Sequence, residues 1–591
     1  MQKDTFISKI LIWIIKNLKH RQLLLSLSLI IGLLSGLAAV FLKNTVYYTS
    51  ELLSGRFAAE TNNLIYLAFP VIGILLTVFF TRYLIRDKIS HGVSKVLHAI
   101  SRRDSVLAPH NSYSSMVAST MTVGFGGSVG LEAPIVLTGA SIGSNLGRFM
   151  KLNYKSVTLL IACGATGAIA GIFKSPIAAM IFSLEVLMLD LTMWSIIPLL
   201  ISAVTGATIA TLLLGQGAVF YFTLHEPFIV DNLPWYILLG ILTGLVSFYF
   251  TWGSLKVESG LQKISSPYQR LFYGGALLGL LIFLFPPLYG EGYGTLRSLL
   301  GGDATEIAGG SLIASFRDNY WVFTGFLFLI LVFKVVAMAV TTGSGGVGGI
   351  FAPSLYVGGV TGFLSASLIN NFSFINVSER NFALVGMAGL MAGVMHAPLT
   401  AIFLIAEITG GYELFIPLII TSTIAYLTIM YFEPHSIYTK RLAARGELIT
   451  HHKDKAVLTL LRMGPVIETD LKTISPDASL GELVKVVSQS KRNIFPVVDE
   501  NDNLQGIVLL DNIRDIIFKP ANYDKLSARD LMDIPPATVS PDENMESVMS
   551  KFEDSGAWNL PVLDDQKYVG FISKSKIFSE YRKILLQFSS E

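Results

Sequence analysis

Residues 126–134 read Gly-Gly-Ser-Val-Gly-Leu-Glu-Ala-Pro, a glycine-rich break with one carboxylate, set between long apolar segments. Glycine frees the backbone and lets another segment approach closely. Proline is tolerated in the first turn of a helix, so Ala133-Pro134 predicts a helix start. A helix start carries unpaired N–H groups and about half a positive charge. We therefore expect Glu132 where an anion is favoured, a place that its own carboxylate or another anion can occupy.

The composition indicates a membrane protein. The chain has 591 residues, of which 52% are hydrophobic and 15% charged, well below the roughly 25% charged residues of soluble domains. The net charge of +2 gives no indication of nucleic-acid binding. The single cysteine, Cys163, excludes an intrachain disulfide. Neither the H-E-x-x-H metal motif nor the G-x-x-x-x-G-K-S/T phosphate-binding loop occurs, and no cofactor is expected.

The first two predicted spans are Leu23–Leu42 and Leu64–Leu84, each about the ~20 residues needed to cross hydrocarbon. A basic segment, residues 1–22, precedes them and predicts a cytoplasmic N-terminus. Later apolar segments are often shorter and interrupted by glycine and proline, which is tolerated only inside protein or beside a cavity. They are Val157–Ala168, Pro176–Leu189, Trp194–Leu214, Trp235–Trp252, Leu271–Leu284, Val322–Val340, Ala383–Ile408 and Leu414–Tyr431.

Small residues also mark a packing face. Gly139, Gly143 and Gly147 recur at every fourth position, a spacing typical of closely packed membrane helices. The membrane part is predicted to comprise residues 23–445.

Residues 446–591 have a different character, with polar segments and apolar runs of strand length. Ile494–Asp499 and Asn559–Asp564 look alike, and a glycine-led strand follows each, at Gly506 and Gly570. The sequence therefore predicts a tandem α/β module in a soluble part, with copies at about 463–520 and 527–586.

The membrane part contains an internal repeat, a signal of duplicated architecture. Val129–Pro134 resembles Gly348–Pro353, and Gly167–Pro176 resembles Gly389–Pro398. The offset from Pro134 to Pro353 is nearly the same as the offset from Pro176 to Pro398. We interpret this agreement as a duplication, with repeats at about 80–220 and 300–440.

Interrupted segments in corresponding places of two halves predict a transport site where the repeats meet. Helix starts from both halves would converge there, and their positive ends favour an anion. Glu185 and Glu407 lie at the same distance past Pro176 and Pro398. Their symmetry fits structural hydrogen bonding better than a role in transport.

These motifs resemble the CLC family of chloride channels and chloride/proton antiporters. The matching stretches are Gly348–Pro353 with Leu355–Gly358, the gating motif Gly130–Pro134, and Ser436–Tyr438. Residues 387–427 match too, and the C-terminal copies resemble cystathionine-β-synthase-type (CBS) modules. The resemblance implies an α-helical multi-pass membrane protein with the inverted-repeat CLC fold and a C-terminal α/β CBS tandem. It also implies a homodimer in a lipid bilayer with a pore in each subunit, in a bacterial inner membrane or plasma membrane, with both termini cytoplasmic.

The resemblance also implies site residues. Backbone N–H groups of Ile350 and Phe351 and the hydroxyl of Tyr438 would contact chloride or another small anion. Glu132 would be the gate of a voltage- or pH-gated pathway: ionised it fills an anion site, and protonated or displaced it opens the way.

Two departures from the family pattern stand out. In the turn that usually gives a serine hydroxyl to the anion, the sequence places His91 and Gly92, and Ser94 stands where proline is usual. Selectivity for chloride is therefore open. Val186 stands at the position of the inner proton-transferring glutamate, next to Glu185, which favours a channel or a weakly coupled carrier. The alternative is a chloride/proton antiporter with a different proton path.

Two further alternatives stay open. Gly126–Gly130 and Gly139–Gly143 fit the G-x-S-x-G pattern, so Ser128 and Ser141 define a remote hydrolase hypothesis. The CBS copies could bind an adenine nucleotide, but neither keeps the usual Thr/Ser and Asp pair. Those positions hold Leu509 and Asn512 in one copy, and Ser573 and Lys576 in the other.

Overall fold

The computed structural model divides the chain into two compact units, residues 1–448 and 449–591. The residues that the structure describes are 19–57, 65–87, 89, 92–102, 105–187, 193–215, 228–302, 304–309, 311, 315, 318–372, 376–443, 461 and 463–589.

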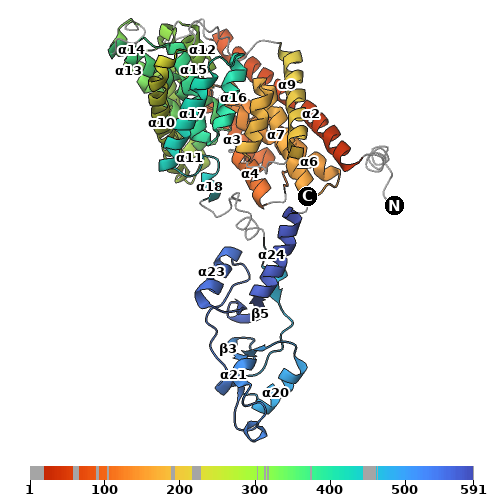
Figure 1. Cartoon of the computed structure of the whole chain (residues 1–591). Coiled ribbons are helices and arrows are strands. Elements are labelled where there is room, and N and C mark those ends of the chain that lie inside the picture. The colour runs from red at the N-terminus through yellow and green to blue at the C-terminus, as the bar shows by residue number, and fades with distance from the viewer. Residues whose placement is uncertain are drawn as a thin grey trace. The chain divides into compact units, whose positions relative to one another are not determined.

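The first unit is a bundle of unequal helices (Figure 1). Its N-terminal half contains α2 (His20–Phe57), α3 (Ile65–Phe79), the π-helical η1 (Phe80–Ile85), α4 (Gly92–Arg102), α5 (Asn111–Gly124), α6 (Glu132–Phe149), α7 (Tyr154–Phe173), α8 (Pro176–Glu185) and α9 (Met193–Leu214). Its C-terminal half contains η2 (Val230–Asn232), α10 (Leu233–Gln262), α11 (Pro267–Leu284), η3 (Pro286–Leu288), α12 (Tyr293–Gly301), η4 (Ala304–Ala308), α13 (Tyr320–Gly343), α14 (Phe351–Phe372), α15 (Glu379–Met395), α16 (Pro398–Thr409), α17 (Phe415–Phe432) and α18 (Lys440–Ala443). Within the described residues, eight candidate spans are long and apolar enough to cross a membrane.

The helices differ from the predicted apolar segments in four respects. Helix α14, a candidate span, is not among the predicted segments, and α10 continues past Trp252 to Gln262. The first segment is longer than predicted, because α2 continues to Phe57 through a more polar stretch. The apolar segment 383–408 is divided into two helices. His396 ends α15 in the left-handed conformation (φ 55°), and Pro398 begins α16. Proline at a first helical position and a left-handed residue after the preceding helix together make a sharp break.

The glycine face on α6 packs as predicted, and its counterpart in the second half packs in the same way. A Cβ at Gly143 would meet the carbonyl oxygen of Leu160 on α7. A Cβ at Gly362 on α14, the equivalent position of the repeat, would meet the carbonyl oxygen of Phe382 on α15. Helices α6 and α7, and helices α14 and α15, are therefore in backbone-to-backbone contact that glycine alone permits.

The second unit contains two similar α/β copies. Its elements are η6 (Gly464–Val466), β1 (Ile467–Glu468), α20 (Leu480–Gln489), β2 (Ile494–Val498), β3 (Leu504–Leu509), α21 (Leu510–Ile513), η7 (Pro520–Asn522), α22 (Ala528–Leu531), α23 (Met545–Ser555), β4 (Asn559–Asp564), β5 (Lys567–Ser573) and α24 (Lys574–Ser589).

Strand pairing reproduces the repeat in this unit. Strands β2 and β3 form one antiparallel pair, and β1, β5 and β4 form a second sheet in that order. Ile474 pairs in parallel with Val497, and Val539 pairs in parallel with Val562, so both partners recur at one common offset. Each copy also has its own buried apolar core. These cores are centred on residues such as Leu480 and Phe495 in the first copy and Val548 and Leu560 in the second.

Candidate functional site

The two glycine-rich motifs meet in space. The N–H of Gly130 donates to the carbonyl of Gly349 at 2.8 Å, and the N–H of Gly349 donates to the carbonyl of Gly130 at 2.6 Å. The two glycines are equivalent positions of the repeat. Because α6 and α14 each begin two positions after one of them, this pairing places the two helix starts side by side.

A second pair of contacts follows the same two-fold relation. The hydroxyl oxygen of Thr122 accepts the N–H of Val347 at 3.0 Å, and that of Thr341 accepts the N–H of Ser128 at 3.3 Å. The two acceptors are equivalent positions of the repeat, and so are the two donors. Each glycine-rich loop is therefore held by a threonine of the other half.

Glu132 is the first residue of α6 and only 3% exposed. Its Oε1 accepts a hydrogen bond from the hydroxyl of Tyr293 at 3.0 Å. Its Oε2 lies against Gly130 and Gly349 and has no hydrogen-bond partner among the described residues. The N–H of Ala352 faces the carboxylate without a well-aligned hydrogen bond to Oε2. The carboxylate thus lies between the starts of α6 and α14, where their positive ends favour it.

The start of α14 contributes backbone more than side chain. Phe351 is its first residue and Ile350 precedes it. N–H groups in a first turn have no acceptor within the helix. The buried Phe351 ring stacks on Phe173 with centroids 5.0 Å apart, so it anchors the helix start in the core. These first-turn N–H groups are the part of α14 that can receive an anion.

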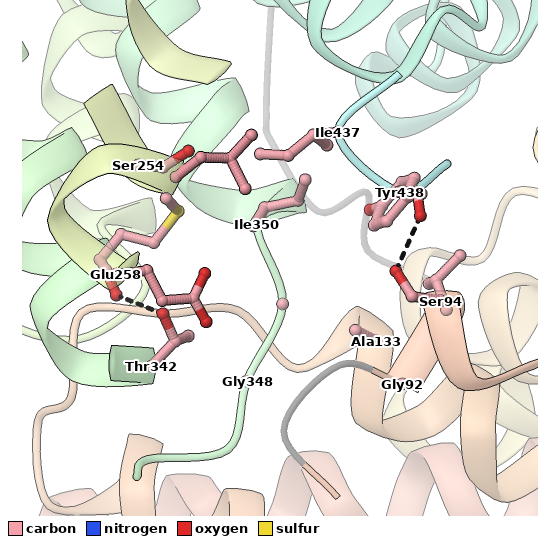
Figure 2. A pocket seen from close by; sticks show the side chains of 14 residues that line it. Gly92, Ser94, Ala133, Ser254, Glu258, Thr342, Gly348, Ile350, Ile437 and Tyr438 are labelled. Atoms are coloured by element: carbon pink, nitrogen blue, oxygen red, sulfur yellow. Dashed lines mark hydrogen bonds between the residues drawn. The ribbon is translucent and has the colours of Figure 1, made fainter. Parts of the chain in front are cut away.

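A cavity of about 40 Å³ lies beside the paired motifs (Figure 2). This volume exceeds the ~10–15 Å³ that a single bound water requires, so the cavity has room for a water molecule or a small ion. Its lining residues are Gly92, Val93, Ser94, Ala133, Ser254, Leu255, Glu258, Met338, Thr342, Gly348, Gly349, Ile350, Ile437 and Tyr438. Gly92, Ile350 and Tyr438, three of the residues singled out in the sequence, therefore share one cavity.

Contacts around the cavity position Gly92 and Tyr438. The carbonyl of Tyr438 accepts a hydrogen bond from the hydroxyl of Ser94 at 3.0 Å, which joins the segment before α18 to α4. A Cβ at Gly92 would meet the carbonyl of Ala133. The start of α4 therefore packs directly on the start of α6, and a third helix start reaches the cavity.

Other predicted residues lie elsewhere or outside the description. Glu132 and Phe351 are not among the residues that line the cavity, whereas their neighbours Ala133 and Ile350 are. Val186 is buried at the C-terminal end of α8, where its N–H donates to Phe182 at 2.8 Å, and it does not line this cavity. His91 falls outside the described residues, so the prediction for its side chain stays a prediction.

The paired acids form a reciprocal contact between the halves. Glu185 accepts the N–H groups of Leu399–Thr400 at 3.1 and 2.8 Å, and also the Thr400 hydroxyl at 2.7 Å. Glu407 accepts the N–H groups of Ile177–Ala178 at 3.1 and 2.9 Å. Each acid thus binds the start of the other half's short helix, α16 or α8. This confirms the structural hydrogen bonding that their symmetry predicted.

Several charged or polar groups near the site were missed in the sequence. Lys334 on α13 is fully buried, donates to the carbonyl of Gly290 at 2.8 Å and lies 4.9 Å from the ring centre of Tyr356. Glu291 is close enough to Lys334 and Glu132 to interact with both electrostatically. Single ionisable residues inside apolar spans are functional candidates by default, and that signal was present in the sequence for Lys334.

The serines of the G-x-S-x-G matches show no catalytic arrangement among the described residues. The Ser128 hydroxyl is buried without a hydrogen-bond partner, and the Ser141 hydroxyl donates to the carbonyl of Ala108 at 3.1 Å. None of the described histidines hydrogen bonds to either serine. Nor does the described part of the chain include a group of three or more histidine, cysteine or acidic side chains that could hold a metal ion.

In the CBS-type copies, the positions considered for ribose make contacts within the unit. The Ser573 hydroxyl donates to Glu468 at 2.5 Å, and the Asn512 amide donates to Asp533 at 2.5 Å. Leu509, which precedes Asn512 in the pair of the first copy, is the last residue of β3.

Comparison with known families matches the membrane part to a family described as voltage-gated chloride channels, over residues 73–429. Residues 464–519 and 528–583 match the CBS domain. Among curated proteins, the chain is 30% identical over 384 residues to a ClcB-like chloride channel protein of Ralstonia nicotianae, covering 63% of this chain and 84% of that protein. It is 26% identical over 436 residues to the H(+)/Cl(-) exchange transporter ClcA of Vibrio cholerae, covering 71% and 88%.

Solved structures show the same fold. A slow cyanobacterial Cl-/H+ antiporter superimposes with a TM-score of 0.61 at 24% identity, over 73% of this chain and 99% of that one. A eukaryotic CLC transporter superimposes with a TM-score of 0.59 at 18% identity, over 94% and 97%. At these identities the likeness concerns the fold alone.

Proposed function

Because the chain belongs to the voltage-gated chloride channel (CLC) family, and is an integral membrane protein for anion transport with a C-terminal CBS pair, we propose that it moves chloride through a pathway gated by Glu132. The observation that carries this proposal is the reciprocal pairing of Gly130 and Gly349. It presents two positive helix starts, from two halves of the chain, to one buried place. Such a place attracts an anion without a full positive charge in the membrane.

In this proposal the Glu132 carboxylate competes with the transported anion. Ionised, it occupies the place between the two helix starts and is held there by Tyr293. Protonated, it loses its attraction to the positive ends, and its side chain can leave. Chloride can then move between two places. One is at the backbone N–H groups of Ile350 and Phe351, at the start of α14, and the other is the cavity lined by Tyr438. Gating is therefore pH-dependent, and voltage acts on the same charge.

We propose a channel or a weakly coupled carrier as the transport mode, because valine at position 186 cannot take up a proton. The second candidate is a chloride/proton exchanger with another proton path. The relatives named as H(+)/Cl(-) exchange transporters favour this candidate.

We also propose a homodimer with one pathway in each subunit, as the resemblance of its motifs to the family implies. The basic residues before α2 support cytoplasmic termini. Contacts within the unit at Ser573 and Asn512 support CBS copies that act without a nucleotide.

Reversal potential in planar bilayers tests this proposal. A chloride gradient is imposed with and without a pH gradient, for the wild type and for Glu132→Gln. For a channel, the potential follows chloride and ignores the pH gradient, whereas in an exchanger it also moves with pH. Glu132→Gln is expected to conduct at all pH values, and Glu306→Gln, an exposed glutamate on η4, serves as the matched control. Undiminished current after replacement of chloride by gluconate on both sides would refute anion transport.

A further inference from the structure

Helix α10 carries a buried carboxylate in its last turns, two residues after Lys256 and beyond the apolar segment Trp235–Trp252. Glu258 lies near its C-terminal end and is only 6% exposed. Carboxylates within membrane helices are costly to bury and usually face a cavity or a pathway. The sequence motifs give this residue no role, and the gate described above does not use it.

Glu258 faces the same cavity as the anion-site residues. The far wall comprises Ser254 and Glu258 from α10 and Thr342 from α13, opposite Tyr438. In Figure 2 the carboxylate points into the cavity, toward the segment of Gly348. Glu258 is the one charged residue among the fourteen that line the cavity.

Close packing of two helices holds Glu258 in this wall. A Cβ at Gly343, at the end of α13, would lie 3.5 Å from the Cα of Glu258 and 2.8 Å from a side-chain carbon of Leu261. Glycine at 343 therefore lets α13 approach α10 where the carboxylate enters the cavity.

Three of the four hydroxyls that line the cavity, all except that of Tyr438, are already used as donors. Ser254 donates to the carbonyl of Thr251 at 3.1 Å, Thr342 donates to the carbonyl of Met338 at 3.3 Å, and Ser94 donates to Tyr438. In this arrangement they present lone pairs rather than hydrogens to the cavity. A protonated Glu258 adds a donor to this wall, whereas an ionised Glu258 adds a negative charge.

An ionised Glu258 and an anion in a cavity of about 40 Å³ repel each other, and the low dielectric of the interior strengthens that repulsion. The presence of the anion therefore favours the protonated carboxyl. Because linkage is reciprocal, protonation of the carboxyl favours anion binding by the same factor.

Other ionisable groups near α10 engage elsewhere. Glu132 does not line the cavity, although its Oε2 lies against the lining residue Gly349, and Tyr438 is the other titratable residue on the cavity wall. The charged residues on neighbouring elements make their own contacts: Lys334 with the Gly290 carbonyl, Lys256 over the ring of Trp252, Arg270 with the Ile264 carbonyl, and Lys440 with Glu433. Glu379 and Arg380 lie at the start of α15.

We propose that Glu258 is the proton-binding group on the Tyr438 side of the anion site, and that its protonation is linked to anion occupancy of the cavity. This inference rests on the proposed chloride pathway and adds a titratable group that Val186 does not supply. The proton comes from water that reaches the cavity, and no covalent step is involved.

Chloride binding to full-length protein in detergent, measured by calorimetry at acidic and alkaline pH, tests the linkage. Glu132→Gln serves as the background, so that the gate no longer titrates. In this background we expect chloride affinity to fall roughly tenfold or more from acidic to alkaline pH, equivalent to about 1.4 kcal/mol. Glu132→Gln/Glu258→Gln should bind with the same affinity at both pH values. Glu132→Gln/Glu306→Gln should behave like the background.

A second measurement does not depend on the folding of a Glu258 variant. Chloride added to the Glu132→Gln protein in weak buffer should make the protein take up protons, whereas gluconate should not. Chloride binding without pH dependence or proton uptake would overturn the Glu258 inference and leave the chloride pathway intact. Equal pH dependence with and without Glu258→Gln would also overturn the inference. No chloride binding at either pH would overturn the pathway and the inference together.

Discussion

The two halves of the membrane unit share a backbone framework but differ in the side chains placed on it. Gly130 and Gly349 pair with each other, and Glu185 and Glu407 each bind the helix start of the other half. At the first residue of the paired helices the likeness ends. Glu132 begins α6, whereas Phe351, which begins α14, stacks into the core. The duplicated contacts therefore form the shared backbone framework, whereas the side chain proposed as the gate lies where the two halves differ.

The largest effects are expected at the glycines through which α6 packs on α7 and α14 packs on α15. Substitutions there test whether the two halves are packed equivalently. Gly143→Val and Gly362→Val each force a side chain onto the backbone of the neighbouring helix, α7 or α15. We expect both variants to lose more than the ~3 kcal/mol typical of overpacking, and therefore to yield little folded protein. Size-exclusion chromatography and thermal unfolding in detergent measure this.

Gly253→Ala is the control, because a Cβ there would have its nearest neighbour at 3.5 Å, an ordinary contact. Normal folding of one valine variant and failure of the other would show that the two helix pairs are not packed equivalently.

Removing the reciprocal acids should have a smaller effect on stability. Glu407→Ala leaves two N–H groups at the start of α8 without their acceptor, and Glu185→Ala leaves two N–H groups and the Thr400 hydroxyl. A buried group left unsatisfied costs about 1–3 kcal/mol, and Glu185→Ala leaves the part-buried Thr400 N–H and hydroxyl without their acceptor together with the exposed Leu399 N–H, so it should lower the unfolding temperature more.

Both variants, once reconstituted, should release chloride from vesicles at the wild-type rate, because neither acid lines the cavity. Loss of chloride release with an unchanged unfolding temperature would place that acid in transport instead.

The smallest expected effect concerns Glu132, which has no counterpart at the equivalent position Phe351. Tyr293→Phe removes the hydroxyl that holds the Glu132 carboxylate. A hydrogen bond to a charged group contributes about 1.5–3 kcal/mol. The ratio of open to closed gates should rise about 10-fold or more at alkaline pH and change little at acidic pH, where Glu132 is protonated.

Chloride release from vesicles at both pH values measures this effect. Tyr320→Phe, whose hydroxyl donates to the Ser367 carbonyl instead, is the matched control. An equal increase in both variants, or none at alkaline pH, would contradict the assigned role of Tyr293.

Much of the backbone framework of the membrane unit could be predicted from the sequence, because its glycine and proline motifs occur twice. Proline after glycine marked the start of α6, and the common offset between the two halves made Gly130 and Gly349 equivalent positions. The shared placement of Glu185 and Glu407 predicted structural hydrogen bonds, although not that each acid reaches the opposite half.

The rest of the site lacked such a pattern. Tyr293 and Glu258 lie in no motif, and their closeness to the gate depends on how α12 and α10 pack in three dimensions. Hydropathy hardly changes across the break between α15 and α16, so only the match of Pro398 to Pro176 indicated it. His396 ends α15 through its left-handed backbone instead. A systematic search for single charges in apolar spans would have found Lys334, but not Glu258, which follows Lys256 beyond the predicted apolar segment.

The reciprocal hydrogen bonds of Glu185 and Glu407 also have a consequence for the evolutionary origin of the two halves. Contacts in which residue i of one copy touches residue j of the other, and j touches i, are those of a symmetric pair of identical chains. The present protein retains this arrangement within one chain. A half-length ancestor would have met its twin upside down in the bilayer, as inverted repeats require. Such an ancestor had to insert in both orientations, and therefore without a strong bias of lysine and arginine to one side. Fusion of the two copies then allowed one half to acquire a gate that the other lacks.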